Sequence, residues 1–278
     1  MKPYKYGNKK MKKIFLALFA AVLSATATNA QLVKVYKNGT LVNTYTNTEQ
    51  NKYKVTFEAV PNDKHDYVEI DGLKWATMNI DATTVASASE EAYGGMYHWG
   101  GKYFSFDRAT VDKEACANGV LKLAYDEANI RWGGSWRMPT VEEFAKLDKA
   151  CGGSGQLSGP VLNAATKLNE NTTITKGGIY WLNKVPLTID GVEYKVKGML
   201  FVTTADPKKR LFFPAAGYSE EEGNVENPEY ECRYWTSTLA DEKNDQCGFS
   251  IFMSGDRIEN SYAQRRAYWR SIRPVMGD

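Results

Sequence analysis

Histidine is the usual general base and metal ligand near neutral pH, and this chain of 278 residues contains only His65 and His98. A Ser-His-Asp triad would need one of these two. The chain has no GxSxG turn, and its closest stretch, residues 152–156 (GGSGQ), is typical of a loop that ends a helix. It also lacks the GxxxxGK[ST] and GxGxxG loops that bind nucleotide phosphates. The sequence therefore predicts no catalytic residue for nucleophilic or nucleotide chemistry.

Paired carboxylates are the other route to catalysis, because glycoside hydrolysis needs two acids about 5–10 Å apart. Acidic runs occur at residues 220–222 and 241–242, in polar stretches typical of solvated loops. A carbohydrate-active hydrolase that uses loop carboxylates is therefore an alternative to weigh against binding. The sequence has no EF-hand spacing and no CxxC motif, so we predict no metal site and no cofactor.

Aromatic and arginine side chains are concentrated in the last third of the chain, and these types dominate binding hot spots. Such rings can stack on sugar faces or on side chains of a protein partner. Trp235 and Trp269 fall in strand patterns that predict core positions. The residues that we predict to bind a ligand are Tyr218, Tyr230, Arg257, Tyr262, Arg265 and Arg266.

The chain contains four cysteines, at positions 116, 151, 232 and 247. In an oxidising compartment four cysteines admit three complete disulfide pairings. Pairing of nearest neighbours is the arrangement that we favour. It would join Cys116 to Cys151 and Cys232 to Cys247.

The N-terminal 30 residues have the order of a secretory signal. Lys12 and Lys13 precede an apolar run over residues 14–23, and small and polar residues follow as far as Ala30. The apolar run is half of the roughly 20 residues that a membrane-spanning helix needs, and no comparable run occurs later. We predict cleavage after Ala30 and a protein secreted to the periplasm or the cell surface, with no integral membrane segment after cleavage. Residues 1–10 add nothing that export requires, so Met11 could be the true start.

Removal of residues 1–30 changes the charge of the chain. This leader contains six lysines and no acid, which leaves 29 basic and 33 acidic residues, a net charge of −4. A slightly acidic domain has no basic surface for phosphate backbones. Nucleic acid is therefore excluded as a partner.

The remaining sequence divides into a short strand-rich segment over 31–64 and one large domain over 65–278. Asn38-Gly39 predicts a β-hairpin over 32–46, with a further strand over 53–59 and a polar break over 61–64. In the large domain, Thr140 and Glu143 form a capping-box pattern that predicts a helix up to Cys151. A shorter helix is predicted over 123–131. Strands are predicted over 67–70, 74–79, 199–203, 211–213, 234–238, 248–253 and 269–275, with long polar connections between them, so the fold class that we expect is α+β.

Six motifs in order carry a family resemblance: LKWATMNI (73–80), YGGMYHWGG (93–101), WGGSWRMPTVEEF (132–144), LFFPAAGY (211–218), YWTSTL (234–239) and SIRPV (271–275). Together they resemble the Fibrobacter succinogenes major paralogous domain family of secreted Bacteroidetes proteins. The resemblance implies a C-type-lectin-like domain with two helices, short antiparallel strands and long loops, in which the N- and C-terminal strands pair. It also implies a ligand-binding or adhesion role at C-terminal loops.

We therefore expect an extracytoplasmic, non-enzymatic binding or adhesion module of the cell envelope, whose partner is a glycan or a protein ligand at the cell surface. The Glu-Pro-Asn and Trp-Asn-Asp motifs of calcium-dependent sugar lectins are not matched, because residues 226–228 read Glu-Asn-Pro and Trp235 is followed by Thr-Ser. Besides the hydrolase, a second alternative is a structural subunit of a surface assembly. In that case the strands of 31–60 would add to the open sheet edge of a neighbour.

Overall fold

The computed structural model describes residues 31–37, 40–47, 65–84, 90–100, 115–221, 224–240 and 247–277. The chain separates into two compact units, residues 1–59 and 60–278. The predicted signal segment, the strand predicted over 53–59 and the break predicted over 61–64 lie outside the described residues. So do Glu222 and the acidic pair 241–242.

The first unit contains one antiparallel hairpin, made by β1 (Gln31–Lys37) and β2 (Thr40–Asn47). Their register runs from Gln31 opposite Asn47 to Lys37 opposite Thr40, with a bulge between Val35 and Tyr36. These strands flank Asn38-Gly39, the dipeptide that predicts them.

The predicted fold class is wrong. We expected an α+β, C-type-lectin-like domain, but the structure is mostly β-sheet, with 42% strand and 12% helix, and does not show that fold. The described residues form two short α-helices, α2 (Glu127–Trp132) and α3 (Val141–Ala150). The prediction failed because several stretches that read as polar connections, such as Thr166–Leu168, pair as strands with partners that lie elsewhere in the chain.

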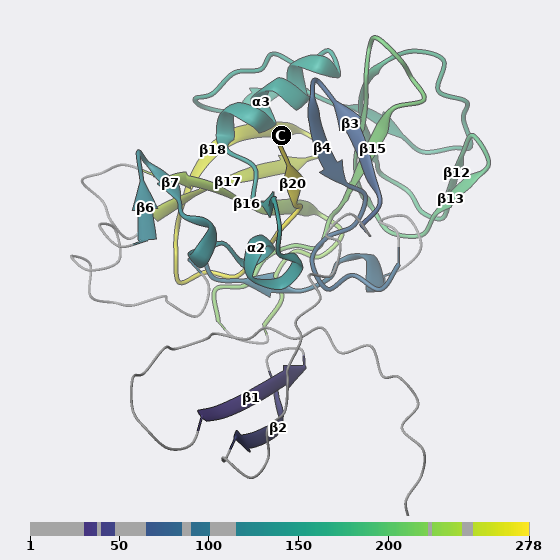
Figure 1. The fold of residues 1–278 in the computed structure, drawn as a ribbon. Coiled ribbons are helices and arrows are strands. Elements are labelled where there is room, and N and C mark those ends of the chain that lie inside the picture. Colours follow the sequence, from purple (N-terminus) through teal and green to yellow (C-terminus); the bar gives the residue numbers. More distant parts are fainter. Residues whose placement is uncertain are drawn as a thin grey trace, which may run out of the picture. The chain divides into compact units, whose positions relative to one another are not determined.

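The N- and C-terminal ends of the second unit meet in a four-stranded sheet (Figure 1). Val275 pairs with Trp75 on one side and with Arg137 on the other, so the last strand lies between two early ones. The pairing of N- and C-terminal strands that the resemblance implied is therefore present. In order across the sheet, the strands are β3 (Tyr67–Ile70), β4 (Leu73–Ala76), β20 (Val275–Met276) and β8 (Trp136–Arg137).

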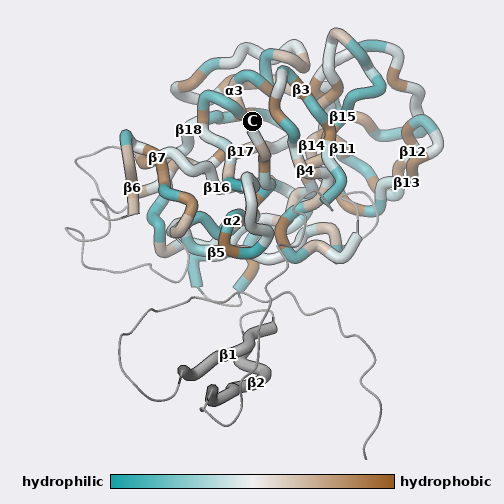
Figure 2. Tube along the Cα trace, in the orientation of Figure 1, coloured by the Kyte–Doolittle hydropathy of each residue, from teal (hydrophilic) through white to brown (hydrophobic). Residues whose placement is uncertain are grey.

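A second four-stranded sheet supplies the most apolar strands. Both faces of its two central strands are buried, which is typical of strands that are covered on two sides. Its strands in order are β10 (Thr166–Leu168), β11 (Gly178–Leu182), β14 (Gly198–Val202) and β15 (Arg210–Pro214), and the separate hairpin of β12 (Leu187–Ile189) and β13 (Val192–Tyr194) follows β11 in the chain. In Figure 2, hydrophobic and hydrophilic stretches alternate along this part of the chain.

The largest sheet has eight strands, and its centre is an antiparallel meander of long strands. Bulges interrupt the meander between Trp235 and Leu239 and between Ser250 and Phe252. Its main path is β5 (Met96–Tyr97), β19 (Arg270–Ser271), β16 (Glu231–Leu239), β17 (Cys247–Ser254), β18 (Arg257–Arg265) and β9 (Val161–Leu162). The short strand β7 (Val120–Leu121) pairs with β16, and β6 (Cys116–Ala117) pairs with β7. The described residues also form two 3-10 helices, η1 (Glu90–Ala92) and η3 (Leu123–Tyr125).

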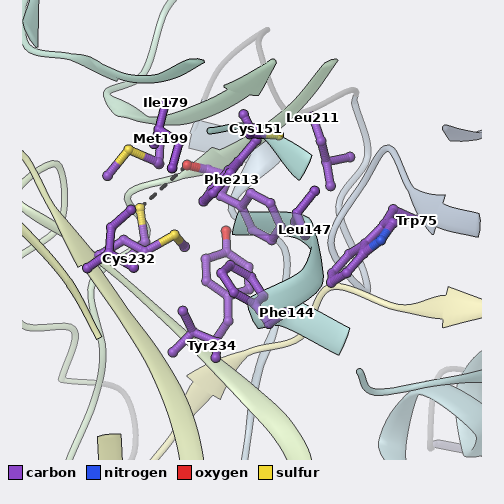
Figure 3. Close-up of a cluster of buried hydrophobic side chains, with 14 of the residues drawn as sticks. Trp75, Phe144, Leu147, Cys151, Ile179, Met199, Leu211, Phe213, Cys232 and Tyr234 are labelled. Carbon is purple, nitrogen blue, oxygen red and sulfur yellow. Dashed lines mark hydrogen bonds between the residues drawn. The ribbon is translucent and has the colours of Figure 1, made fainter. Parts of the chain in front are cut away.

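Helix α3 places Phe144 at the centre of the main hydrophobic core (Figure 3). The Phe144 ring makes edge contacts with Trp75, Phe201 and Phe213, with ring centroids 5.8, 5.7 and 5.5 Å apart. Edge-to-face aromatic pairs add stability beyond the area that they bury. Residues of both four-stranded sheets and of the eight-stranded sheet therefore meet in one core around α3.

The capping box predicted for α3 is confirmed. The Thr140 hydroxyl accepts a hydrogen bond from the backbone N–H of Glu143 at 3.2 Å, and the Glu143 carboxylate accepts one from the backbone N–H of Thr140 at 2.8 Å. Arg137 pairs with the same carboxylate at 2.5 Å and lowers the pKa of Glu143. The helix predicted over 123–131 is split into η3 and α2, because Asp126 caps α2 in an extended conformation.

The predicted disulfides do not form, because no two cysteines of the described residues lie at disulfide distance. Cys151 ends α3 and Cys232 lies in β16, and both are buried in the main core. Burial raises the pKa of the Cys151 thiol to about 12. Cys116 and Cys247 are half-buried on β6 and β17, which are separated in the sheet by β7 and β16. Sequence proximity was therefore a poor guide to distance.

Arg273 is fully buried and joins distant parts of the second unit. Its guanidinium donates to the Asn79 side-chain oxygen at 2.9 Å and to the backbone carbonyls of Ala76, Thr77 and Phe212 at 3.0, 2.8 and 2.9 Å. Burial lowers the pKa of Arg273 to about 10, so the side chain stays charged at neutral pH. This network accounts for the arginine of the SIRPV motif.

Asp126 is also buried, and it connects α2 to the strand that follows. Its two carboxylate oxygens accept hydrogen bonds from the backbone N–H groups of Ala128 and Met138, each at 2.8 Å. Burial raises the pKa of Asp126 to about 6, although these hydrogen bonds and the charge of Arg137 oppose the shift.

A raised pKa means that the folded chain holds this proton more tightly than the unfolded chain. The contribution of Asp126 to the free energy of unfolding therefore increases as the pH falls through 6 toward 4. We expect the difference in unfolding free energy between the natural chain and Asp126→Asn to grow by roughly 1 kcal/mol from pH 8 to pH 5 in urea titrations. Asp71→Asn, at an exposed turn, is the control, and a difference that shrinks toward pH 5 would contradict the assignment.

Among the described residues, no helix has the length and apolar character needed to cross a membrane.

Candidate functional site

A row of stacked arginine and aromatic side chains crosses one face of β16, β17 and β18. Arg233 on β16 lies opposite Phe252 on β17, and side chains of directly opposed residues share a face. The neighbouring pair, Tyr234 and Ile251, is buried on the other face. The bulge at Ser250/Phe252 brings Tyr262 of β18 to the same face, where its ring meets that of Phe252 at a centroid distance of 5.8 Å. We call Arg233, Phe252, Tyr262 and the two residues stacked on them, Tyr218 and Arg257, the arginine ladder.

Arg233 is the centre of this ladder. Its guanidinium carbon lies 4.0 Å from the ring centre of Tyr218, 5.2 Å from that of Phe252 and 5.3 Å from that of Tyr262. Its Nε donates to a Glu231 carboxylate oxygen at 3.0 Å, and both side chains are about nine-tenths buried. Arginine over an aromatic face gains cation–π attraction that increases as water is excluded. The ladder therefore fixes the rings of Tyr218 and Tyr262 before any ligand arrives.

A second guanidinium lies against Tyr218. The Arg270 guanidinium carbon is 4.8 Å from the Tyr218 ring centre, and the Arg270 side chain is fully buried. Arg270 donates to the carbonyls of Ser219 and Trp269 at 3.1 and 2.9 Å and to the Gln264 side-chain oxygen at 2.9 Å. Burial lowers the pKa of Arg270 to about 10, and the positive charge of Arg233 acts in the same direction.

An open pocket of about 410 Å³ lies along the β18 end of the ladder. It combines tyrosine rings, cationic groups, a carboxylate and an amide, which are the groups that orient a polar ligand. We call it the β18 pocket. Its lining residues are Tyr218, Glu220, Arg233, Cys247, Tyr262, Ala263, Gln264, Arg265 and Tyr268.

Three of the predicted binding residues, Tyr218, Tyr262 and Arg265, come together in this pocket. Tyr218 lies in the connection between β15 and β16 and Arg265 ends β18, whereas Tyr262 lies within β18 and not in a loop. Arg257 does not line the pocket, but it continues the ladder, with its guanidinium carbon 4.3 Å from the ring centre of Phe252.

The other two predicted binding residues lie elsewhere. Tyr230 is 72% exposed and stacks with Lys197, outside the lining of the pocket. Arg266 is only 3% exposed. Its guanidinium carbon lies 4.8 Å from a ring centre of Trp99, and its Nε donates to the carbonyl of Cys247, so its role is in the fold.

Sequence reasoning did not select Arg233 and Gln264, which also line the β18 pocket. A signal for Arg233 was present, because Glu231 and Arg233 alternate with the buried residues Cys232 and Tyr234 and so share the opposite face of the strand. No comparable signal marks Gln264, since its place in the pocket depends on the register of β17 and β18.

The residues with classical catalytic chemistry are scattered. His65 stacks on Trp132 with ring centroids 3.6 Å apart, and burial lowers its pKa. His98 packs against Trp269 at 4.0 Å. Among the described residues that line the β18 pocket, Glu220 is the sole carboxylate, so these residues do not assemble the acid pair of a glycosidase. No group of three His, Cys, Asp or Glu within the described ranges could hold a metal ion.

A second hollow of about 300 Å³ has less to offer a ligand. It is lined by small polar residues around Thr172 and Thr188, and its carboxylate, Asp190, is already paired with Arg210 at 2.6 Å. We therefore take the β18 pocket as the candidate site.

Comparisons of the chain with protein-family models, with curated proteins and with solved structures found no match. The family resemblance of the six motifs therefore stays a prediction.

Proposed function

We propose that this chain is an extracytoplasmic, non-enzymatic binding or adhesion module whose ligand binds in the β18 pocket. The observation that supports the proposal is the arginine ladder, because it holds Tyr218 and Tyr262 rigidly beside an open, polar pocket. Side chains that are ordered before binding lose little conformational entropy when the ligand arrives. The secretory order of residues 1–30 supports a partner outside the cytoplasm, such as a glycan or a protein at the cell surface.

A pair of tyrosine variants tests this proposal. Tyr262 lines the pocket, whereas Tyr230 is a more exposed tyrosine outside it. The full chain would be screened on a glycan array with neutral and acidic members, and on a panel of surface proteins. Tyr262→Ala is expected to weaken binding of the captured ligand about ten-fold or more, since truncated interface tyrosines often cost this much.

The control Tyr230→Ala is expected to bind as the natural chain does. If both variants bind with unchanged affinity, the ligand binds elsewhere and the proposed site is wrong. If neither array nor panel yields a ligand, the proposed function fails.

A further inference from the structure

We propose that the β18 pocket selects a sugar that carries a carboxylate, that is, a uronic acid residue of an acidic glycan. This inference rests on the proposed function and adds the chemical class of the ligand. It follows from three features of the pocket: its positive charge, the buried arginine behind it, and the mixture of rings and hydrogen-bonding groups on its walls.

The first feature is an excess of arginine. Arg233 and Arg265 line the pocket, and Arg270 lies behind it, in contact with the lining residues Tyr218 and Gln264. Glu220 is the carboxylate that lines the pocket with Arg233 and Arg265. Glu231 and Glu226 lie outside the lining, where Glu231 is hydrogen-bonded to Arg233 and Glu226 interacts with Tyr218. The guanidinium fork pairs with a carboxylate through two parallel hydrogen bonds. A ligand with a carboxylate would thus complement the charge that these residues leave in excess.

The second feature is that Arg270 is buried and makes no salt bridge among the described residues, although the charges of Glu220 and Glu231 act on it. Its hydrogen-bond acceptors are two carbonyls and one amide oxygen, all neutral, and its Nε has no hydrogen-bond partner there. A buried charge is costly unless an opposite charge or several dipoles compensate it. A negative ligand group in the adjoining pocket would supply part of this compensation.

The third feature distinguishes a uronic acid from other anions and from neutral sugars. The tyrosine rings offer flat faces for the C–H side of a sugar ring, and the oxygens of Glu220 and Gln264 can accept hydrogen bonds from hydroxyl groups. A bare phosphate has no hydroxyl-bearing ring and would leave the tyrosine rings unused, whereas a neutral sugar would leave the arginines unpaired. One uronic acid residue can pair with the arginines, stack on the tyrosine rings and donate hydroxyl hydrogen bonds to the acceptor oxygens. The pocket volume is within the range of small-ligand sites.

The test compares sugars that differ only at the carboxylate. The full chain is titrated with tetrasaccharides of galacturonate, glucuronate and mannuronate, and with the same tetrasaccharides after reduction of each carboxyl to a hydroxymethyl group. At least one uronate is expected to bind about ten-fold or more tightly than its reduced partner, since hydrogen bonds to charged groups are roughly twice as strong as neutral ones.

Two variants test whether the preference for the uronate arises in the β18 pocket. Arg265→Met is expected to remove most of the preference for the uronate over its reduced partner, while Tyr262→Ala weakens binding of both sugars. Lys208→Met removes an exposed positive charge outside the pocket, and it is expected to leave unchanged both the affinity for the two sugars and the preference for the uronate.

Equal affinity for a uronate and its reduced partner would overturn the inference while leaving a sugar site in the β18 pocket. Binding that Tyr262→Ala leaves intact would overturn both the inference and the proposed function. Failure of all six sugars to bind would overturn the inference, and the protein panel described above would then decide whether the pocket binds a ligand of another kind.

Discussion

Arg273→Met is expected to lower the free energy of unfolding by about 4 kcal/mol or more, which is a large part of the total stability of a typical domain. Two effects compete in this variant. Removing a buried charge relieves its desolvation, and hydrophobic replacement of buried ions can even stabilise a protein. Four oxygen acceptors from Asn79, Ala76, Thr77 and Phe212 would, however, lose their donor. Buried groups left unpaired cost about 1–3 kcal/mol each, so their loss outweighs the gain.

Urea unfolding followed by tryptophan fluorescence measures this effect. Lys208→Met provides the matched control, because it removes an exposed positive charge with the same replacement. Arg273→Lys is expected to be intermediate, since an ammonium has three donors and cannot reach acceptors as widely spread as a guanidinium does. A loss below about 1 kcal/mol in Arg273→Met would show that the network is not needed for stability.

Arg233→Met is expected to produce the largest loss of binding, about 50-fold or more for a uronate tetrasaccharide that the natural chain binds, because it removes a pocket cation and the support of two rings at once. It is also expected to lower the free energy of unfolding by about 3 kcal/mol, since Glu231 would be left buried without its partner. Binding is measured by calorimetry and stability by urea unfolding.

The double variant Arg233→Met with Glu231→Gln separates these two effects. Removing the orphaned charge should recover much of the stability, because paired replacement of a buried ion pair is far less costly than removal of one partner. Binding should stay weak. If binding returned together with stability, Arg233 would act on the ligand only through the fold, and the ladder would have no direct role.

Local features of the sequence predicted local structure well. The capping box of Thr140 and Glu143 and the strand over 67–70 are present as predicted, because a cap or a short alternating strand depends on neighbours in the chain. The fold class could not be predicted in the same way. Strands such as β10 are too short and polar to show a period, and they form because a separate strand, here β11, pairs with them.

The candidate site was predicted only in part, because residue types can be read from the sequence whereas burial depends on the three-dimensional fold. Composition singled out Tyr218, Tyr262 and Arg265, which line the β18 pocket, since these residue types are unusual in such number outside a core or a binding site. Composition could not separate them from Arg266, because burial under Trp99 depends on where the chain turns after β18. It also could not predict that a bulge in the meander places Tyr262 beside Phe252.

A crystal structure of the full chain with a bound uronate tetrasaccharide tests the β18 pocket most directly. The expected result is a sugar ring stacked on Tyr218 or Tyr262, with its carboxylate within hydrogen-bond distance of Arg233 or Arg265 and with the ladder side chains unmoved. A sugar bound outside this pocket, or a ladder that must unstack to admit it, would contradict a site built in advance by β16, β17 and β18.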